Sequence, residues 1–239
     1  MKTKLALASG QGKNEPFPTE RELAQFRINL LAWFASHGRN FYWREATASN
    51  YVKIVSEVLL QRTQAGVVSK FLPDFLENYS GWKEISESDE ENIGDILRPL
   101  GLWRRRAASL YALAKEVIRR QEKWPSKREE LETIPGVGQY VASAILLFEY
   151  GKREPLMDAS MARLLRRYFY IKPEKVDIRY DKQLHHVAYE VLTEGDPIAL
   201  NWAMLDFASL QCRINYAGCN SCALKTRCRY HLQSPNPLC

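Results

Sequence analysis

The sequence predicts an all-α protein made of two helical domains. Three observations predict this fold class. Apolar residues recur at helical spacing along most of the chain, helix-starting and helix-ending residues flank these segments, and no segment alternates apolar and polar residues as a half-buried strand would. Hydrophobic residues make up 46% of the 239 residues, which is enough for a substantial buried core.

Capping signals define the first predicted helices. Thr19 and Glu22 form a capping box that opens a helix ending at Gly38, and Ser88 with Glu91 forms a second capping box. Two helices are expected over residues 50–79, with a break near Gln64–Gly66, and further helices over residues 103–121, 126–134, 139–151, 158–169, 181–195 and 197–212. Helices therefore account for most of the chain.

Composition limits the partners and the compartment. Net charge is +6, and basic clusters interleaved with aromatic residues lie on predicted helices, as in residues 103–120. Charge alone favours solvated helix faces over a polyanion partner, so nucleic-acid binding needs independent support. No apolar segment approaches the roughly 20 residues that span a bilayer, and the apolar part of the first ten residues is too short for a signal peptide. We therefore expect a protein that is not secreted and has no membrane contact, with residues 1–18 as a disordered tail.

Four of the five cysteines fall within seventeen residues near the end of the chain. Cys212, Cys219, Cys222 and Cys228 have the spacing C-x6-C-x2-C-x5-C, and Cys239 lies outside it. An odd count with one tight cluster differs from the dispersed cysteines of a disulfide-bonded secreted protein. The four thiols therefore predict metal or cluster ligation in a reducing compartment, and this donor set suits both zinc and iron–sulfur chemistry.

A glycine-rich corner, "TIPGVGQY" at residues 133–140, precedes a strongly apolar helix. Gly136 and Gly138 permit backbone conformations that a side chain would oppose, and they let the backbone approach another molecule closely. The free N–H groups at the start of the next helix form an anion site that suits a DNA phosphate. An ordinary helical hairpin packed inside the protein fits the corner equally well.

Context favours DNA. Residues 131–169 resemble the helix-hairpin-helix motif and downstream aspartate of the HhH-GPD superfamily of DNA glycosylases. That superfamily includes endonuclease III, the A/G-mismatch adenine glycosylases and the archaeal-type thymine-DNA mismatch glycosylases. The cysteine spacing resembles its [4Fe-4S] loop, and "SEVLLQRTQAGVV" at residues 56–68 is similar to the segment that carries a catalytic glutamate in the two mismatch glycosylases.

The resemblance runs from Thr19 to His231 and implies the architecture. A six-helix barrel domain is expected over residues 45–150, with the helix-hairpin-helix at 131–144. An iron–sulfur cluster domain would combine residues 19–44 with 151–232, residues 233–239 would form a tail, and DNA would lie across the cleft between the domains. The four clustered cysteines would hold a [4Fe-4S] cluster through their thiolates.

The resemblance also implies three catalytic residues. Asp158 would cap a helix and stabilise the positive charge that develops on the sugar as the glycosidic bond breaks. Glu57 aligns with the residue that protonates the leaving base in adenine glycosylases, and for thymine we expect it to orient the base or position water. Tyr140 stands where bifunctional members have a lysine; a phenol forms no imine, so water is the expected nucleophile, although nearby Lys152 allows weak strand cleavage. Without the resemblance, a solvated glutamate and a packing tyrosine explain Glu57 and Tyr140.

Seven residues are predicted to bind DNA. Arg62 aligns with the position that fills the gap left by an extruded base, and its fork of donors suits an orphaned guanine; a surface phosphate contact is the alternative. Leu102 aligns with a second, apolar wedge. The others flank Arg62 or belong to the hairpin: Gln61, Gln64, Gly136, Gly138 and Gln139.

The predicted function is monofunctional, mismatch-specific DNA glycosylase activity in base excision repair, by base flipping, on thymine and uracil opposite guanine. "RTQAG" and "NWAMLDFASLQCR" are closer to the thymine enzymes, whereas Gln61 is the residue expected in adenine enzymes. The alternative is an adenine glycosylase acting on A·G or A·8-oxoG. A strand-cleaving lyase is disfavoured by Tyr140, and a non-catalytic Fe–S DNA-binding protein by the presence of Glu57 and Asp158. We expect a monomer that binds double-stranded DNA containing a mismatch or damaged base. Such a protein would be intracellular, and in a prokaryote cytoplasmic and nucleoid-associated.

Overall fold

The computed structural model describes residues 17–215 and 218–233, and every regular element in them is helical. The all-α prediction is confirmed. The α-helices are α1 Glu20–His37, α2 Asn50–Leu60, α3 Ala65–Asn78, α4 Trp82–Glu87, α5 Glu90–Leu97, α6 Trp103–Arg119, α7 Arg128–Leu131, α8 Gln139–Tyr150, α9 Ala159–Phe169, α10 Lys182–Val191, α11 Pro197–Leu210 and α12 Arg229–Gln233. Short 3-10 turns lie between them at η1 Tyr42–Arg44, η2 Arg98–Leu100, η3 Ile178–Tyr180, η4 Cys219–Ser221 and η5 Lys225–Arg227.

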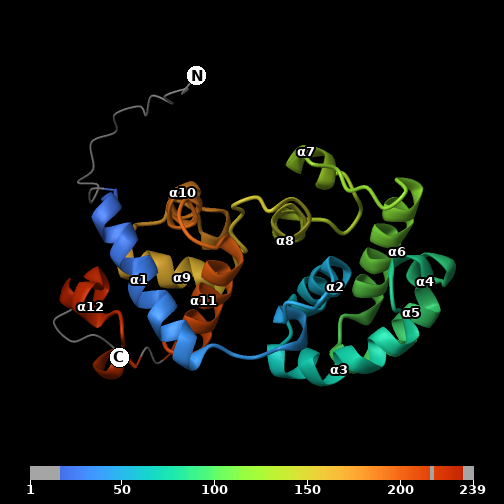
Figure 1. The fold of residues 1–239 in the computed structure, drawn as a ribbon, viewed down its shortest axis with the longest axis horizontal. Coiled ribbons are helices and arrows are strands. Elements are labelled where there is room, and N and C mark those ends of the chain that lie inside the picture. Colours follow the sequence, from blue (N-terminus) through green and yellow to red (C-terminus); the bar gives the residue numbers. More distant parts are fainter. Residues whose placement is uncertain (1–16, 216–217, 234–239) are drawn as a thin grey trace.

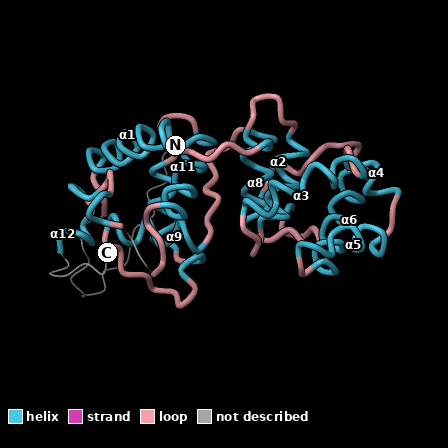
Figure 2. The backbone as a smooth tube through the Cα atoms, turned by 90° about the horizontal axis from the view of Figure 1, so that it is seen from below, coloured by secondary structure: helices cyan, strands magenta, loops and turns pink. Residues whose placement is uncertain are grey.

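The helices gather in two lobes (Figures 1 and 2). The first lobe contains α2 to α8, and the second lobe contains α1 together with α9 to α12. The chain therefore begins in the second lobe, passes through the whole first lobe and returns. Helix α8 lies beside the second lobe and contacts α11. The domain limits given above stay predictions.

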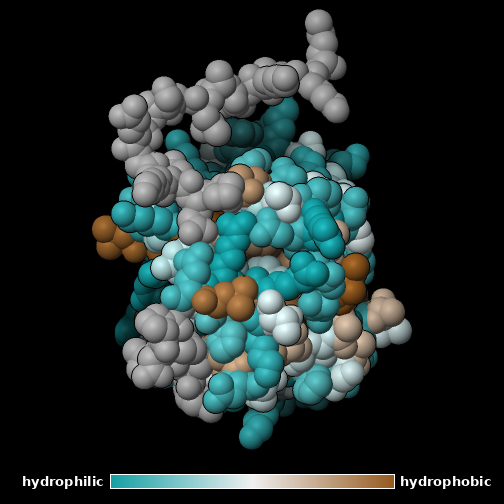
Figure 3. Space-filling model, turned by 90° about the vertical axis from the view of Figure 1, so that its left-hand side faces the viewer, coloured by the Kyte–Doolittle hydropathy of each residue, from teal (hydrophilic) through white to brown (hydrophobic). Residues whose placement is uncertain are grey.

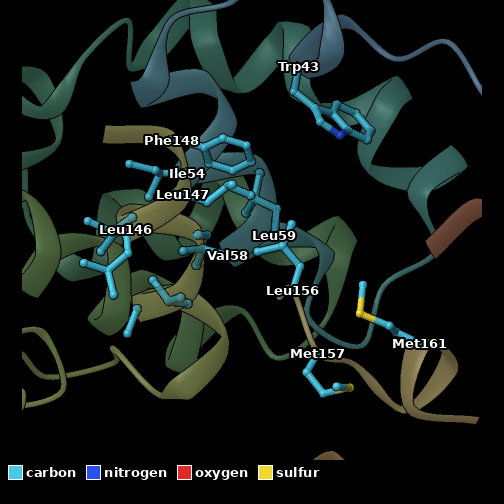
Figure 4. Packing of buried hydrophobic residues seen from close by; sticks show 14 of the residues in the cluster. Trp43, Ile54, Val58, Leu59, Leu146, Leu147, Phe148, Leu156, Met157 and Met161 are labelled. Carbon is cyan, nitrogen blue, oxygen red and sulfur yellow. The ribbon is translucent and has the colours of Figure 1, made fainter. Parts of the chain in front are cut away.

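The core of the first lobe is centred on α2 and α8, which pack against each other. Ile54, Val58 and Leu59 from α2 are buried near Leu146 and Leu147 from α8 (Figure 4). Burying each such side chain contributes about 1.5–3 kcal/mol to folding. Because eight of the twelve residues of α8 are buried, this helix is held firmly, and residues in its first turn have defined positions.

Of the two predicted capping boxes, one is confirmed and one is wrong. The capping box of Thr19 and Glu22 is confirmed at the start of α1. The box predicted from Ser88 and Glu91 is wrong, because Ser88 ends α4 and its hydroxyl lies 3.0 Å from the Tyr79 hydroxyl. Asp89 caps α5 instead, accepting a hydrogen bond of 2.8 Å from the N–H of Asn92.

The break predicted near Gln64–Gly66 separates α2 from α3 at residues 61–64. Cys239 and most of the two predicted tails lie outside the described residues. Within the part of the chain that the structure describes, no helix has the length and apolar character needed to cross a membrane. The outer end of the second lobe is mostly hydrophilic where it is not drawn grey, and its hydrophobic residues stand apart (Figure 3).

Candidate active site

A cleft of about 610 Å³ lies between the lobes. It is lined by the end of α2, the turns at residues 61–65 and 102, the glycine corner, and the segments at residues 157–160 and 179–180. Two buried residues, Trp43 and Met157, belong to its wall (Figure 4). All ten residues predicted to be catalytic or DNA-binding line it: Glu57, Gln61, Arg62, Gln64, Leu102, Gly136, Gly138, Gln139, Tyr140 and Asp158.

Glu57 and Tyr140 form a hydrogen-bonded pair inside the cleft. The Tyr140 hydroxyl donates to Glu57 Oε2 over 2.7 Å, and the packing of α2 against α8 brings the two residues together. The residue Glu57 is only 2% exposed. Burial raises the pKa of its carboxyl group to about 7, against the lowering effects of the Tyr140 hydrogen bond and the Arg44 charge. Burial also raises the pKa of Tyr140 well above its usual 10, so the phenol stays a neutral donor at physiological pH.

Asp158 faces the same cleft and caps α9, as the sequence predicts. Its Oδ1 accepts a hydrogen bond of 2.6 Å from the N–H of Met161. Burial raises the pKa of this carboxyl group, and hydrogen bonds from Met161 and Ser160, followed by the charge of Arg163, oppose that rise. The cap fixes one carboxylate oxygen on the backbone. The group is therefore held in place beside the cleft rather than swinging on a free side chain.

An ion-pair network that was not predicted from the sequence lies behind Glu57. Arg44 lines the cleft, and its guanidinium donates to both oxygens of Asp206 at 2.8 and 3.0 Å. Arg39 donates to the same carboxylate at 2.6 and 2.9 Å. Asp206 is fully buried on α11, and two arginines satisfy its charge, which holds its pKa below the usual range despite burial. The network anchors Arg44, whose charge favours the ionised form of Glu57. A lone aspartate within an apolar helix, "NWAMLDFASL", was the available sequence signal.

The two predicted wedge residues stand on left-handed turns at the cleft. Arg62 has φ of 58°, and Leu102 has φ of 49° and is 52% exposed. Such a conformation costs a non-glycine residue about 1–2 kcal/mol. Buried Arg106 connects the two turns. Its guanidinium donates a hydrogen bond of 2.6 Å to the Gln61 carbonyl oxygen and one of 2.8 Å to the Leu100 carbonyl oxygen. One arginine therefore organises both turns, a role that was not predicted from the sequence.

The two glycines of the corner serve different purposes. Gly136 has φ of +84°, and a Cβ atom there would lie 2.5 Å from Ser109 Oγ, so both its backbone and its packing require glycine. Gly138 has φ of −92°, and a Cβ atom added there would meet nothing within 4 Å. The conformational freedom of glycine is therefore used at Gly136, whereas Gly138 leaves open space in which another molecule can approach the backbone closely. Both glycines are exposed at the cleft, so the corner is not packed inside the protein.

Gln139 lines the cleft and His185 supports it, whereas Lys152 lies outside it. The Gln139 amide nitrogen lies 2.7 Å from His185 Nε2, although no role for His185 was predicted from the sequence. Lys152 does not line the cleft; its ammonium donates to the Ser126 carbonyl. Among the described residues that line the cleft there is no lysine.

The four clustered cysteines line one small pocket in the second lobe. Arg167 Nη1 lies 3.5 Å from Cys212 Sγ, which places a positive charge beside the sulfur atoms, and apolar side chains form most of the remaining wall. Cys212, Cys222 and Cys228 are free thiols in this structure, whereas Cys219 is disulfide-bonded. With Cys219 reduced, the four sulfur atoms and the adjacent guanidinium fit an anionic thiolate-bound cluster. Within the described ranges, however, no three His, Cys, Asp or Glu side chains are placed around one metal position.

A family comparison matches residues 55–188, more than half of the chain, to the HhH-GPD superfamily of base excision DNA repair proteins. The chain belongs to this superfamily. The matched segment contains Glu57, the glycine corner, Tyr140 and Asp158.

Relatives within the superfamily differ in how much of their length this chain covers. The thymine-DNA glycosylase of Aeropyrum pernix is 31% identical over 90% of this chain and 98% of its own length. The thymine/uracil-DNA glycosylase of Pyrobaculum aerophilum is 32% identical over 87% of this chain and 91% of its own length. The adenine DNA glycosylase of Homo sapiens is 25% identical over 87% of this chain but only 40% of its own length. The solved structure of a thermostable thymine-DNA glycosylase has a TM-score of 0.80 at 28% identity, covering 90% of this chain and 98% of that chain.

Proposed function

We propose that this chain is a monofunctional DNA glycosylase that hydrolyses the N-glycosidic bond of thymine and uracil opposite guanine. The observation that carries the proposal is the hydrogen-bonded pair of Glu57 and Tyr140 in the same arginine-lined cleft as Asp158. These groups match the needs of hydrolysis at a sugar carbon: a fixed negative charge, a proton acceptor and an oriented hydroxyl.

The proposed reaction uses water as the nucleophile. The extruded base leaves with the bonding electron pair, and the sugar gains positive charge, which the ionised Asp158 carboxylate stabilises. Water adds to the sugar carbon, and its proton passes to the Glu57 carboxylate, whose pKa of about 7 suits both proton uptake and release at neutral pH. The proton then reaches the departing base. The products are the free base and an abasic site with an intact backbone.

Strand cleavage is not expected. A lyase step requires an amine that forms an imine with the sugar. Tyr140 has none, and Lys152 is held outside the cleft by the Ser126 carbonyl. We therefore expect no covalent enzyme–DNA adduct when borohydride is added during turnover.

Two observations support thymine and uracil over adenine. The relatives named for thymine or for thymine and uracil are 31% and 32% identical over 90% and 87% of this chain, against 25% over 87% for the human adenine enzyme. The fold also resembles a solved thymine-DNA glycosylase over 98% of that chain. Adenine opposite guanine or 8-oxoguanine remains the second candidate, because Gln61 lines the cleft where adenine enzymes are expected to carry this residue.

The decisive experiment uses duplexes containing T·G, U·G, A·G and A·8-oxoG, each analysed with and without alkali. We expect base release from T·G and U·G, with strand breaks only after alkali, because the abasic product is alkali-labile. Release from the adenine duplexes alone would favour the second candidate. Breaks without alkali would show lyase chemistry and refute the monofunctional assignment.

A [4Fe-4S] cluster held by Cys212, Cys219, Cys222 and Cys228 is part of this proposal. Its support is the spacing of the cysteines, their common pocket and the nearby Arg167 guanidinium. When bound, the cluster would cross-link the last loop to Cys212, which follows the end of α11, and no step of the hydrolysis requires electron transfer. Brown protein with broad absorbance in the visible blue is expected, whereas a colourless protein containing zinc would contradict the cluster.

The remaining parts of the proposal are the partner and the oligomeric state. Double-stranded DNA containing a mismatch is the expected ligand, since the cleft joins arginines with an exposed glycine corner at a helix start. The cleft is built from one chain, so a monomer is sufficient for binding. Sedimentation of the protein with and without a mismatched duplex tests both points.

A further inference from the structure

The second lobe presents an exposed aromatic side chain to the cleft. Tyr180 ends the η3 turn, is 55% exposed and lines the cleft, to which the first lobe contributes the two wedge turns. An aromatic ring at this position is not needed for the buried core. Its exposure to the cleft requires another explanation, such as a ligand with a flat apolar face.

The turn that carries Tyr180 is held rigidly from below. Asp181, the next residue, is fully buried and accepts backbone hydrogen bonds from Glu174 at 2.6 Å and from Leu184 at 3.1 Å. It therefore ties the start of the loop to the first turn of α10. These bonds hold the backbone that carries Tyr180 in a defined place, so little backbone entropy is lost when the turn binds a ligand.

The same turn is tied to the DNA-binding hairpin. His185 Nε2 lies 2.7 Å from the carbonyl oxygen of Arg179 and 2.7 Å from the amide nitrogen of Gln139, the first residue of α8. The Arg179 side chain pairs with Asp177 at 2.6 Å, and its guanidinium lies 5.6 Å from the centre of the Tyr180 ring. The backbone of the turn is thus tied to the start of α8, and the ring of Tyr180 has the Arg179 guanidinium beside it.

The charge of the cleft indicates the kind of ligand. Among the described residues that line it are six arginines and two carboxylates: Arg39, Arg44, Arg62, Arg105, Arg106 and Arg179, with Glu57 and Asp158. Asp206 pairs with Arg39 and Arg44, and Asp177 pairs with Arg179, so the net charge around the cleft is still positive. Such a surface attracts a polyanion. An aromatic ring within a cationic groove is the arrangement that stacks on nucleobases, since every base has a flat π-face. A base in duplex DNA offers no free face, but an extruded base does.

We propose that Tyr180 stacks on the extruded base and holds it in the cleft. This inference rests on the proposed function and names a residue for it. Tyr180 supplies ring contact from the second lobe, while Glu57 and Asp158 act on the bond to be broken. Because stacking does not depend on the pattern of donors and acceptors, Tyr180 would strengthen the capture of thymine and uracil alike.

The test measures binding without turnover. One duplex carries 2′-fluoro-thymidine opposite guanine, in which the fluorine slows bond cleavage; the other carries a tetrahydrofuran abasic analogue opposite guanine and has no base to stack. For Tyr180→Ala we expect about 5- to 150-fold weaker binding to the first duplex, from the strength of base–aromatic stacking. Binding to the abasic duplex should change by less than about twofold, the usual effect of a surface substitution that removes no specific contact.

Two further variants make the result specific. Tyr180→Phe keeps the ring and should bind both duplexes as wild type does. Tyr42→Ala is the matched control, because Tyr42 is 48% exposed on the 3-10 turn η1 but does not line the cleft, and it should leave both affinities unchanged. Circular dichroism of each variant establishes that the fold is retained.

The outcomes separate the two proposals. Equal loss for both duplexes in Tyr180→Ala, or loss in Tyr180→Phe as large as in Tyr180→Ala, would overturn base stacking in favour of a backbone or hydroxyl contact. Equal loss in Tyr42→Ala would overturn the role of the cleft position. If wild type releases thymine from T·G but Tyr180→Ala binds normally, only this inference fails. If wild type neither releases the base nor prefers the fluorinated mismatch over a matched duplex, the proposed function fails with it.

Discussion

Glu57→Gln should make the protein more stable at neutral pH while it removes activity. The folded protein holds this carboxyl group with a pKa of about 7, against a usual 4.5. A folded-state pKa above the unfolded value means that the folded state binds the proton more tightly. Ionisation of Glu57 therefore lowers the free energy of unfolding. The loss is absent below the unfolded pKa, grows as the pH rises from about 4.5 to 7, and is complete above that range.

The magnitude follows from the pKa difference. One pKa unit corresponds to about 1.4 kcal/mol, so the buried carboxylate destabilises the fold by about 3 kcal/mol at pH 8 and by about 1 kcal/mol at pH 5. Glutamine removes the ionisation, and its amide oxygen still accepts the hydrogen bond from Tyr140. The variant should therefore be more stable than wild type by about 3 kcal/mol at pH 8, and most of that gain should vanish at pH 5.

Urea unfolding followed by tryptophan fluorescence measures this difference, since the chain has six tryptophans. Comparing the two proteins at pH 5 and pH 8 cancels effects of the substitution that do not depend on pH. Glu77→Gln is the matched control, because it removes one exposed carboxylate on α3 and should leave the stability difference near zero.

One result would refute the reasoning. If Glu57→Gln is no more stable than wild type at pH 8, or gains equally at pH 5, then Glu57 is not a desolvated carboxylate in the folded protein. Its proposed role as a proton acceptor near neutral pH would lose its physical basis. A rise in stability together with a sharp fall in single-turnover base release is the expected pattern of a residue kept for function.

Three other substitutions test the site. Asp158→Asn keeps an oxygen for the 2.6 Å cap on the N–H of Met161 but removes the negative charge, so base release should fall by at least about 100-fold while binding of mismatched duplex survives; normal turnover would exclude the role. Gly138→Ala should weaken DNA binding without changing thermal stability, because the added Cβ meets only open space. Gly136→Ala should destabilise the fold by about 1–3 kcal/mol, because of the φ of +84° at this position and the contact of the added Cβ with Ser109. Equal stability of the two variants would contradict this difference. Arg62→Ala should reduce the preference for guanine as partner base by about 1–3 kcal/mol in equilibrium titrations, and an unchanged preference would favour a phosphate contact.

Several features were predictable from local sequence because local physics decides them. The capping box at Thr19 and the cap at Asp158 follow from residue types a few positions apart. The all-α class follows from apolar spacing, and the hairpin follows from the glycine corner and the helix after it. The same local reasoning failed at Ser88, where two helices meet within two residues. A contact with Tyr79, nine residues away, occupies the hydroxyl that was expected to cap α5.

Tertiary structure decided the chemistry of the site. Glu57 and Tyr140 are 83 residues apart, and only the packing of α2 against α8 turns them into a pair and sets the pKa of the carboxyl group. Arg44 gains its place from Asp206, 162 residues later, and Tyr180 gains its fixed turn from buried Asp181 and from His185. Helical periodicity shows which face of a helix is buried, but it carries no information on which helix covers that face. The burial of Glu57, the charges beside it and the open space around Gly138 all depend on which helices pack together. That pairing is known only from the folded structure.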